Sequence, residues 1–499
     1  MKSLSHTSSN KSNGSIFTKA DESEKVISRS NTASPISIEN THLTKSERDS
    51  LLFRLDLVLA PTIMILYLVA FLDRSNIGNA KVAGLPEDLK LKGDQFNIIA
   101  SVFYVTFILF EMPTTLLMKK VQPKRMLAFI VISYSLTTIF TGFCHNFGGL
   151  LAARLVLGFC EAGLFPCLAL YLTMIYSRVE LAPRIAYLFA SSALSGAFGG
   201  LFAYAVLHMD GVGGFAGWRW LFIIEGLIGF VCGVAVYFII PNDITKAWFL
   251  SKTHQEMMRK RQLERAADLE AAHFDWKGVK SAFTDFKVYL YALSEFGQDT
   301  CLYGFSTFLP AIISGMGYTS LSVQYMTIPV YILGAATYIA ASFLSDRFHH
   351  RGIILIIGNI FPIVGYILLL ACQNNKSVLY FACYLCSVGV YTGAGLNVTW
   401  LSANIAPHYK RATAISLQLA IANSSGILAG QIYRYPPKYI AGHLTSLIAI
   451  FISTVLHVVN IFFLKHQNSK KQKSLASSST IDLSEQPKDD KDARFHYIL

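Results

Sequence analysis

The feature that most constrains this chain is a series of long apolar stretches separated by short polar connections. A helix needs about 20 consecutive apolar residues to cross a hydrocarbon core about 30 Å thick. Only 15% of the 499 residues are charged, against about 25% in a typical soluble protein. Because a soluble protein would not hold so many long buried helices, we predict an all-α membrane protein with twelve transmembrane helices. They are expected at 55–80, 96–118, 126–144, 147–174, 185–207, 218–240, 286–313, 323–345, 352–371, 378–401, 411–433 and 442–465.

The basic residues of the connections predict how the chain is oriented. Four connections are rich in Lys and Arg: 119–125, 178–184, 346–351 and 408–411. Those near residues 145, 210 and 316 contain neither. Because loops rich in Lys and Arg stay on the cytoplasmic side, we expect both termini in the cytoplasm and an even number of spans. The connection 81–95, with three lysines on the expected outer side, breaks this pattern.

The spans divide into two six-helix halves, 51–240 and 286–465, which is the layout of transporters built from parallel repeats. The connection 241–285 contains THQEMMRKRQLERAADLEAA, and its helix formers and alternating charges predict an amphipathic helix on the cytoplasmic face. The tails 1–50 and 466–499 are polar, and we expect both to be disordered in the cytoplasm.

Charged residues inside the spans are the strongest indication of a functional site. Each costs roughly 2.5–3.5 kcal/mol to insert, so it needs a partner or a watery cavity. Asp73 and Arg74 follow the first apolar run, in LDRSNIGNA, and point about 100° apart on a helix. Arg154 and Glu161 share one face of the fourth span, about 10 Å apart. Since neither pair neutralises itself easily, both indicate a cavity in which an arginine holds a carboxylate and a desolvated carboxyl takes up a proton.

Other interpretations of these charges remain open. Asp73 and Arg74 are also compatible with snorkelling at an outer helix end, and Arg154 and Glu161 with a structural ion-pair network. In the second half, Asn397 and Trp400 end the tenth span and Asn423 lies in the eleventh, so they could form another cavity wall or hydrogen bonds between helices. Further acids inside the spans have no role that the sequence decides: Glu111, Glu225, Glu295 and Asp299.

Several segments resemble those of the major facilitator superfamily, and more narrowly of the fungal allantoate permease family of anion:cation symporters. They are LDRSNIGNA, RLVLGFCEAGLFP, GWRWLFIIEG, KAWFLS and KRATA, and the resemblance covers roughly residues 51–466. The segments NIGNAKVAGLPEDLKL, FGGLFAYA, FLPAIISGMGY and MTIPVY favour a member that carries nicotinate. The loop motif of the superfamily is degenerate in MKKVQPKRM, whereas SDRFHHRG keeps an acid and a base.

The resemblance implies alternating access driven by a proton gradient, without a metal or another cofactor. It implies proton coupling by Asp73 and Glu161 and gating by Asp346 and Arg347. The expected substrate-binding residues are Arg74, Asn76, Arg154, Asn397, Trp400 and Asn423.

The expected function is therefore import of a small organic carboxylate, nicotinate first, by proton symport. Alternatives are permeases for allantoate, ureidosuccinate, pantothenate, biotin or another vitamin-like anion, and, in a different class, a nutrient sensor that does not transport. An enzyme is not expected, because HExxH, GxSxG and a Walker lysine loop are absent. The expected partners are the substrate anion, protons and the lipid bilayer, with no nucleic acid. We expect a monomer in the plasma membrane, with the vacuolar and endoplasmic reticulum membranes as alternatives.

Overall fold

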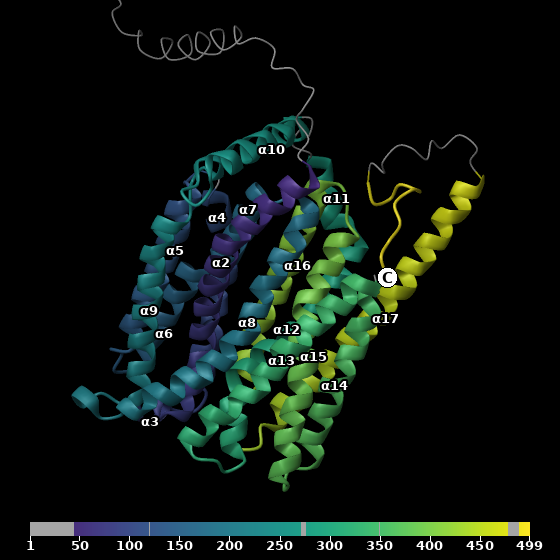
Figure 1. Cartoon of the computed structure of the whole chain (residues 1–499). Coiled ribbons are helices and arrows are strands. Elements are labelled where there is room, and N and C mark those ends of the chain that lie inside the picture. The colour runs from purple at the N-terminus through teal and green to yellow at the C-terminus, as the bar shows by residue number, and fades with distance from the viewer. Residues whose placement is uncertain (1–43, 119, 271–275, 349, 478–488) are drawn as a thin grey trace, which may run out of the picture.

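The computed structural model describes residues 44–118, 120–270, 276–348, 350–477 and 489–499, and these residues form helices without a strand. The first half contains α2 (Lys45–Val82), α3 (Leu85–Asp88), α4 (Gln95–Met118), α5 (Pro123–Thr141), α6 (Phe147–Glu161), α7 (Leu164–Ile175), α8 (Arg178–Val206) and α9 (Gly217–Ile239). The second contains α12 (Phe286–Gly315), α13 (Ser320–Phe348), α14 (Arg351–Ala371), α15 (Lys376–Ala403), α16 (His408–Ile432) and α17 (Ile440–Ser477). Between them lie α10 (Lys252–Glu270) and α11 (Trp276–Thr284). The halves stand side by side, purple to blue and green to yellow in Figure 1.

Ten helices of the described chain are long and apolar enough to cross a membrane, with α6 and α7 together making one of them. An all-α, multi-pass membrane protein is thus confirmed. Two predicted spans, 126–144 and 286–313, correspond to α5 and α12 and are not among the ten. Their sequences are more polar, since α5 begins with PKR and α12 holds three charged residues. Both helices still pack within the bundle, and the count of twelve spans and the cytoplasmic termini remain predictions.

The halves are joined at the end of the bundle opposite the start of α2. Asn97 of α4 donates to the carbonyl of Gly430 (2.7 Å), and Gln431 donates to the hydroxyl of Ser101 (2.7 Å). Ser320 of α13 donates to the carbonyl of Val82 (3.1 Å). These bonds link the last turns of α2 and α16 to the first turns of α13 and α4. The bundle is therefore closed at this end.

Glycines allow the two halves to approach so closely. A Cβ on Gly78 would lie 1.9 Å from the carbonyl oxygen of Thr307, so the backbones of α2 and α12 touch there. A Cβ on Gly200 of α8 would lie 2.5 Å from the side-chain hydroxyl of Thr327 in α13, and one on Gly430 of α16 would lie 2.3 Å from the hydroxyl of Ser101 in α4. Small residues let the helices pack closely. In lipid this packing stabilises helix association, because the hydrophobic effect does not drive helices together there. We call these contacts the glycine seam.

The central connection forms a helix, α10, that packs across the end of the bundle where α2 begins (Figure 1). Met258 and Arg261 are its buried residues there. Arg261 and Arg48 both pair with Glu180, at the start of α8. Burial would raise the pKa of Glu180, but the Ser177 amide and Arg261 lower it to about 2. This ionised carboxylate ties α10 to the bundle.

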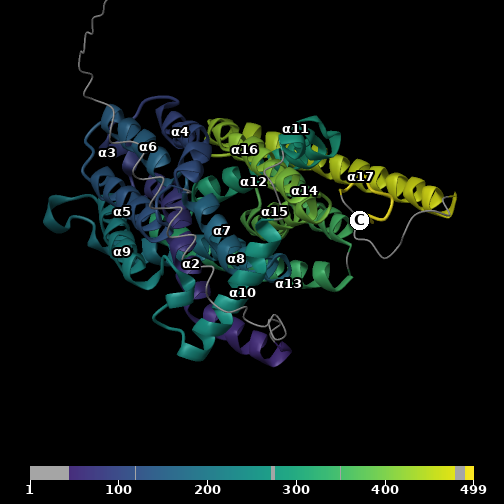
Figure 2. The ribbon, with the colours of Figure 1, turned by 90° about the horizontal axis from the view of Figure 1, so that it is seen from above.

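The chain beyond residue 466 was expected to be disordered, and the structure differs. Helix α17 continues to Ser477 and, as the view from above shows, projects from the bundle (Figure 2). Residues 489–499 return to the second half, where Asp490 and Tyr497 are buried. We call residues 489–499 the C-terminal strap. Residues 1–43, most of the other tail, lie outside the described residues, and α2 already begins at Lys45 behind a Thr44 capping box.

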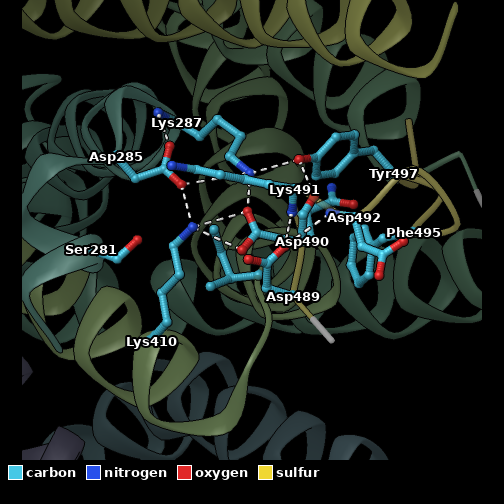
Figure 3. Close-up of polar contacts among 12 residues, drawn as sticks. Ser281, Asp285, Lys287, Lys410, Asp489, Asp490, Lys491, Asp492, Phe495 and Tyr497 are labelled. Carbon is cyan, nitrogen blue, oxygen red and sulfur yellow. Dashed lines mark hydrogen bonds and ion pairs between the residues drawn. The ribbon is translucent and has the colours of Figure 1, made fainter. Parts of the chain in front are cut away.

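The strap is held by charges and by backbone hydrogen bonds (Figure 3). Asp490 pairs with Lys287 of α12 and with Lys410 of α16, and Asp285 pairs with the same two lysines. Burial opposes ionisation, but the two lysines hold the pKa of Asp490 below its ordinary value. The backbone of Ile498 is bonded to Asn404 in both directions and accepts from the indole of Trp400. A polar segment can fold back here because its one buried acid meets two buried cations.

Removing the carboxylate at the centre of the strap should release it. Asp490→Asn leaves Lys287 and Lys410 sharing Asp285 alone, which should cost about 2 kcal/mol or more. Hydrogen–deuterium exchange of residues 489–499 should become clearly faster than in the wild type, whereas Lys491→Ala, at an exposed side chain, should leave it unchanged. Because the folded pKa of Asp490 is depressed, its stabilisation is complete above an ordinary Asp pKa of about 3.9 and is lost as the pH falls through the lower folded value. Equal exchange in both variants would contradict the role of Asp490.

A side chain at Gly78 should open the glycine seam. In Gly78→Ala the added methyl group overlaps the backbone of Thr307, so the closed end should separate. A cysteine placed at Ser306, in the cavity described below, should then react at least several-fold faster with a thiol reagent applied from the closed end. Gly148→Ala is the control, since its nearest contact would be an ordinary 3.6 Å. Unchanged reactivity at Ser306→Cys would show that the seam is not the closure.

Candidate substrate and proton site

Helix α2 does not end where its apolar run ends but continues through LDRSNIGNA to Val82. Asp73, Asn76 and Asn79 are all buried, and Asp73 is only 1% exposed. These polar side chains therefore face other helices and do not snorkel at a helix end.

Arg74 and Glu161 form an ion pair between α2 and α6. The Arg74 Nη2 lies 2.7 Å, and its Nε 2.8 Å, from the same oxygen, Oε1 of Glu161. Glu161 is fully buried, and its Oε2 has no partner. The guanidinium also lies 4.6 Å from the ring centres of Phe71 and Phe107. The rings exclude water from the ion pair and so strengthen it. The second oxygen of the carboxylate, Oε2 of Glu161, remains free to bind a proton.

The helix breaks directly after Glu161. Helix α6 ends at Glu161 and α7 begins at Leu164, with Gly163 between them and Pro166, which has no N–H, in the first turn of α7. A Cβ on Gly163 would lie 2.1 Å from the methyl group of Thr114, so α4 packs directly against the break. Glu161 thus lies at a discontinuity in the helix rather than inside a regular turn.

Asp73 and Arg154 lie near this pair without forming an ion pair themselves. Neither oxygen of Asp73 has a hydrogen-bond partner, and the Nε and Nη2 of Arg154 have none. The ion pair that does form, Arg74 with Glu161, joins two different helices, as expected from the orientation of the charges on their own helices.

Asn76 is hydrogen-bonded to other side chains of the protein. Its Nδ2 donates to Glu225 of α9 (2.5 Å), and its Oδ1 accepts from Asn79 (2.9 Å). Asn76 lines neither cavity described below, so its expected contact with a substrate has no support in the geometry.

Two adjoining cavities open beside Arg74. The first holds about 330 Å³ of space between its lining atoms, part of it continuous with solvent. It is lined by Phe71, Arg74, Ser75, Tyr104, Ser192, Ser195, Gly196, Leu302, Tyr303, Ser306 and Tyr391. The second holds about 260 Å³ of such space and is lined by Arg74, Ile77, Ala100, Phe103, Tyr104, Arg154 and Thr307. Both halves contribute walls, and Arg74 and Tyr104 border both cavities.

The second half contributes less than expected. Asn423 is placed at the boundary, where it accepts from Tyr303 (2.8 Å) and donates to Glu111 (3.1 Å). Asn397 instead donates to Ser294 and to the carbonyl of Tyr291. Trp400 is fully buried beneath the C-terminal strap. Asn397 and Trp400 therefore do not line the cavity, because residues of α12 and the strap occupy their polar groups.

The expected gating residues lie away from the cavity. Asp346 is 71% exposed at the end of α13 and pairs with Arg351 at 3.0 Å, and Arg347 is exposed beside it. Their role in gating remains a prediction.

Most of the tyrosine and serine side chains that line the first cavity around Arg74 were not predicted from the sequence. Tyr104 and Tyr303 face each other from the two halves, with ring centres 4.9 Å apart, and Ser192 and Ser195 lie on one face of α8. Two signals could have found them. Tyr303 stands one turn after the unexplained Asp299, and the serines are three residues apart inside an apolar helix.

Two repeated halves around a polar cavity, with one end closed, are the architecture of a secondary transporter. The family model of the Major Facilitator Superfamily matches residues 63–430, and the chain belongs to this family. It is similar to an uncharacterized transporter of Schizosaccharomyces pombe, with 46% identity over 89% of this chain and 90% of that one. It is also similar to the high-affinity nicotinic acid transporter of Saccharomyces cerevisiae, with 34% identity over 84% of this chain and 78% of that one.

Solved structures show the same fold. A bacterial homolog of the human lysosomal transporter Spinster, inward-facing and unoccupied, matches with a TM-score of 0.64 and 16% identity, over 84% of this chain and 98% of that one. A D-xylose–proton symporter matches with a TM-score of 0.62 and 12% identity, over 81% and 97%. The family and its relatives are transporters, so the chain is a membrane transporter and not an enzyme.

The Arg74–Glu161 pair should show the stability pattern of a buried ion pair. Arg74→Met or Glu161→Met alone leaves one buried charge uncompensated and should cost about 3–5 kcal/mol, whereas the double variant should recover most of that loss. Thermal unfolding of the purified protein in detergent, followed by size-exclusion chromatography, measures this. Additive losses in the double variant would show that the two residues act independently.

Proposed function

We propose that the chain imports a small organic carboxylate, nicotinate first, by proton symport. The observation that carries this proposal is Arg74, a cation only 13% exposed at the border of a two-sided cavity, whose partner, Glu161, can be neutralised by one proton. The cavity is closed at the end opposite the start of α2. We also propose a monomer in the plasma membrane, with both termini on the cytoplasmic side.

The chemistry follows from competition for one guanidinium. While Glu161 is ionised, its carboxylate occupies Arg74. When Glu161 takes up a proton, Arg74 is left without an anion, and a substrate carboxylate can replace Glu161 as its partner. One proton and one anion then bind together, and neither binds well alone, since either single event leaves an unpaired charge in a desolvated site.

The other walls suit a flat aromatic acid. Phe71, Tyr104, Tyr303 and Tyr391 offer ring faces, and Ser192 and Ser306 offer hydroxyl groups near the same cavity. A pyridine ring fits such a combination of stacking surfaces and hydrogen-bond donors. The similarity to a transporter that carries nicotinic acid supports nicotinate as the first candidate. Allantoate, ureidosuccinate, pantothenate and biotin also carry a carboxylate for Arg74.

Uptake of labelled nicotinate by fungal cells without their own nicotinate permease tests the function. Wild-type uptake should be faster at acidic than at neutral external pH and should stop with a protonophore. Arg74→Ala should lower uptake about 30-fold or more, because truncating one partner of a buried charge pair costs roughly 2–5 kcal/mol. Arg74→Lys should recover only part of it, since a lysine keeps the charge but not the fork of donors.

The controls separate substrate from mechanism. Glu87→Gln, at an exposed acid, should leave uptake unchanged. A chain that reaches the surface but carries no nicotinate would exclude this substrate and direct the same assay to the other anions. Uptake that is the same at acidic and neutral pH, and the same with and without the protonophore, would contradict proton symport. A response to substrate with no uptake would indicate a sensor.

A further inference from the structure

Helix α12 carries two acids in line with the cavity. Glu295, Asp299 and Tyr303 are spaced by four residues and so share one face, with neighbouring Cβ atoms about 5–6 Å apart. Tyr303 lines the cavity. From there the row runs back toward Phe286, where α12 starts near α11, at the same end of the bundle as α10 and the start of α2 (Figure 1).

These two acids, like Asp73 and Glu225, lack the ion pair that several other buried acids have. Glu161, Glu180 and Asp490 each pair with an arginine or a lysine. Glu295 is 1% and Asp299 5% exposed, one oxygen of each has no partner, and no ion pair of the described chain includes either. Two unpaired carboxylates on neighbouring turns would repel each other and be poorly solvated. A proton is therefore the simplest neutralising partner.

The helices around α12 offer no fixed cation for the pair. Their ionisable groups include Tyr67 and Arg74 on α2, Tyr331 on α13, Cys383, Cys386 and Tyr391 on α15, Lys410 on α16, and His443 and His457 on α17. Lys81 of α2 lies 4.9 Å from the ring centre of Phe308, toward the closed end of α12. Lys410 is held by Asp285 and Asp490, and Arg74 by Glu161.

The packing of α12 against α2 places Asp299 relative to Arg74. Gly78 and Thr307 touch, and both helices run in the same direction from the end where α10 lies. Arg74 precedes Gly78 by four residues, about 6 Å, and Asp299 precedes Thr307 by eight, about 12 Å. Asp299 therefore lies about one turn beyond Arg74, away from the closed end, and Glu295 another turn beyond that.

We propose that Glu295 and Asp299 form a second proton site, which moves one proton per cycle in addition to the proton exchanged at Glu161. The proton binds as O–H on Asp299 beside the cavity, passes to Glu295, and leaves toward the end where α2 begins. One monovalent carboxylate then enters with two protons, and each cycle carries one net positive charge inward. The inference rests on the proposed proton symport and makes that symport electrogenic.

Asn397 gains a role as a positioning residue for this pair. Its Nδ2 donates to Ser294, the neighbour of Glu295. This placement accounts for a buried asparagine that does not reach the cavity.

The test uses the purified full chain in proteoliposomes with labelled nicotinate. Without a pH gradient, a potassium diffusion potential of about 100 mV, negative inside and set with valinomycin, should drive accumulation. One net charge allows a ratio of up to about fifty-fold at that potential. A pH gradient without a potential should also drive uptake.

Neutral variants assign the charge to the pair. Asp299→Asn and Glu295→Gln should lose the response to the potential but keep the response to the pH gradient and the exchange of labelled for unlabelled nicotinate. Asp299→Glu should keep the response to the potential, and so should Glu87→Gln, the control at an exposed acid.

The outcomes separate the two proposals. No nicotinate transport under any gradient would overturn the proposed function itself. Transport driven by the pH gradient but not by the potential, in the wild type, would leave symport intact and overturn the second proton site. A full response to the potential in both neutral variants, or loss of exchange in folded variants, would also overturn the assignment, since the pair would then be either idle or part of the substrate site.

Discussion

The cost of isolating a charge from water is the constraint on which this transporter depends. Within the bundle that cost is met by pairing residues from different helices, and the pair of Arg74 and Glu161 joins α2 to the broken helix α6–α7. The same cost makes the pair reactive. Any change in the charge of Glu161 leaves Arg74 in need of another anion, so the interaction that stabilises the empty site also defines what the site can bind. Stability and selectivity thus have a common origin here.

Closure depends on a different property, the absence of side chains. Gly78, Gly200 and Gly430 allow close approach of the two halves: Gly78 packs against the backbone of Thr307, and the other two pack against the hydroxyls of Thr327 and Ser101. Contacts of this kind contribute packing and a few hydrogen bonds to backbone carbonyls, but the inter-half bonds of this seam include no buried ion pair. Because the seam contains no buried charge, it can separate and re-form without exposing an unpaired ion to lipid. This property suits a boundary between two halves that move relative to each other.

The sequence predicted the all-α membrane fold and selected four charged residues of the first half, for one physical reason. In a bilayer, apolar length and intramembrane charge are both visible along the chain, so Asp73, Arg74, Arg154 and Glu161 could be selected before any contact was known. The sequence could not predict contacts between helices that are distant in the chain. Two such contacts are the ion pair of Arg74 with Glu161 and the ring contact of Tyr104 with Tyr303. Trp400 was misplaced because its environment depends on the strap, whose polar composition resembles that of a disordered tail.

Comparing the buried acids explains why some hold the structure and others are suited to move protons. Asp490 and Glu180 each face two cations, and an acid so held stays ionised at any physiological pH, so it acts as a fixed tie. Glu161 faces one cation, Arg74, which in the proposed mechanism a substrate carboxylate binds in its place. Glu295 and Asp299 face none. The fewer the permanent cations around a buried carboxylate, the more its charge depends on a proton, so this order runs from structural tie, through exchange with substrate, to proton transfer. It also follows position, with Glu180 at the start of α8, Asp490 in the C-terminal strap, and Glu161, Glu295 and Asp299 near the cavity.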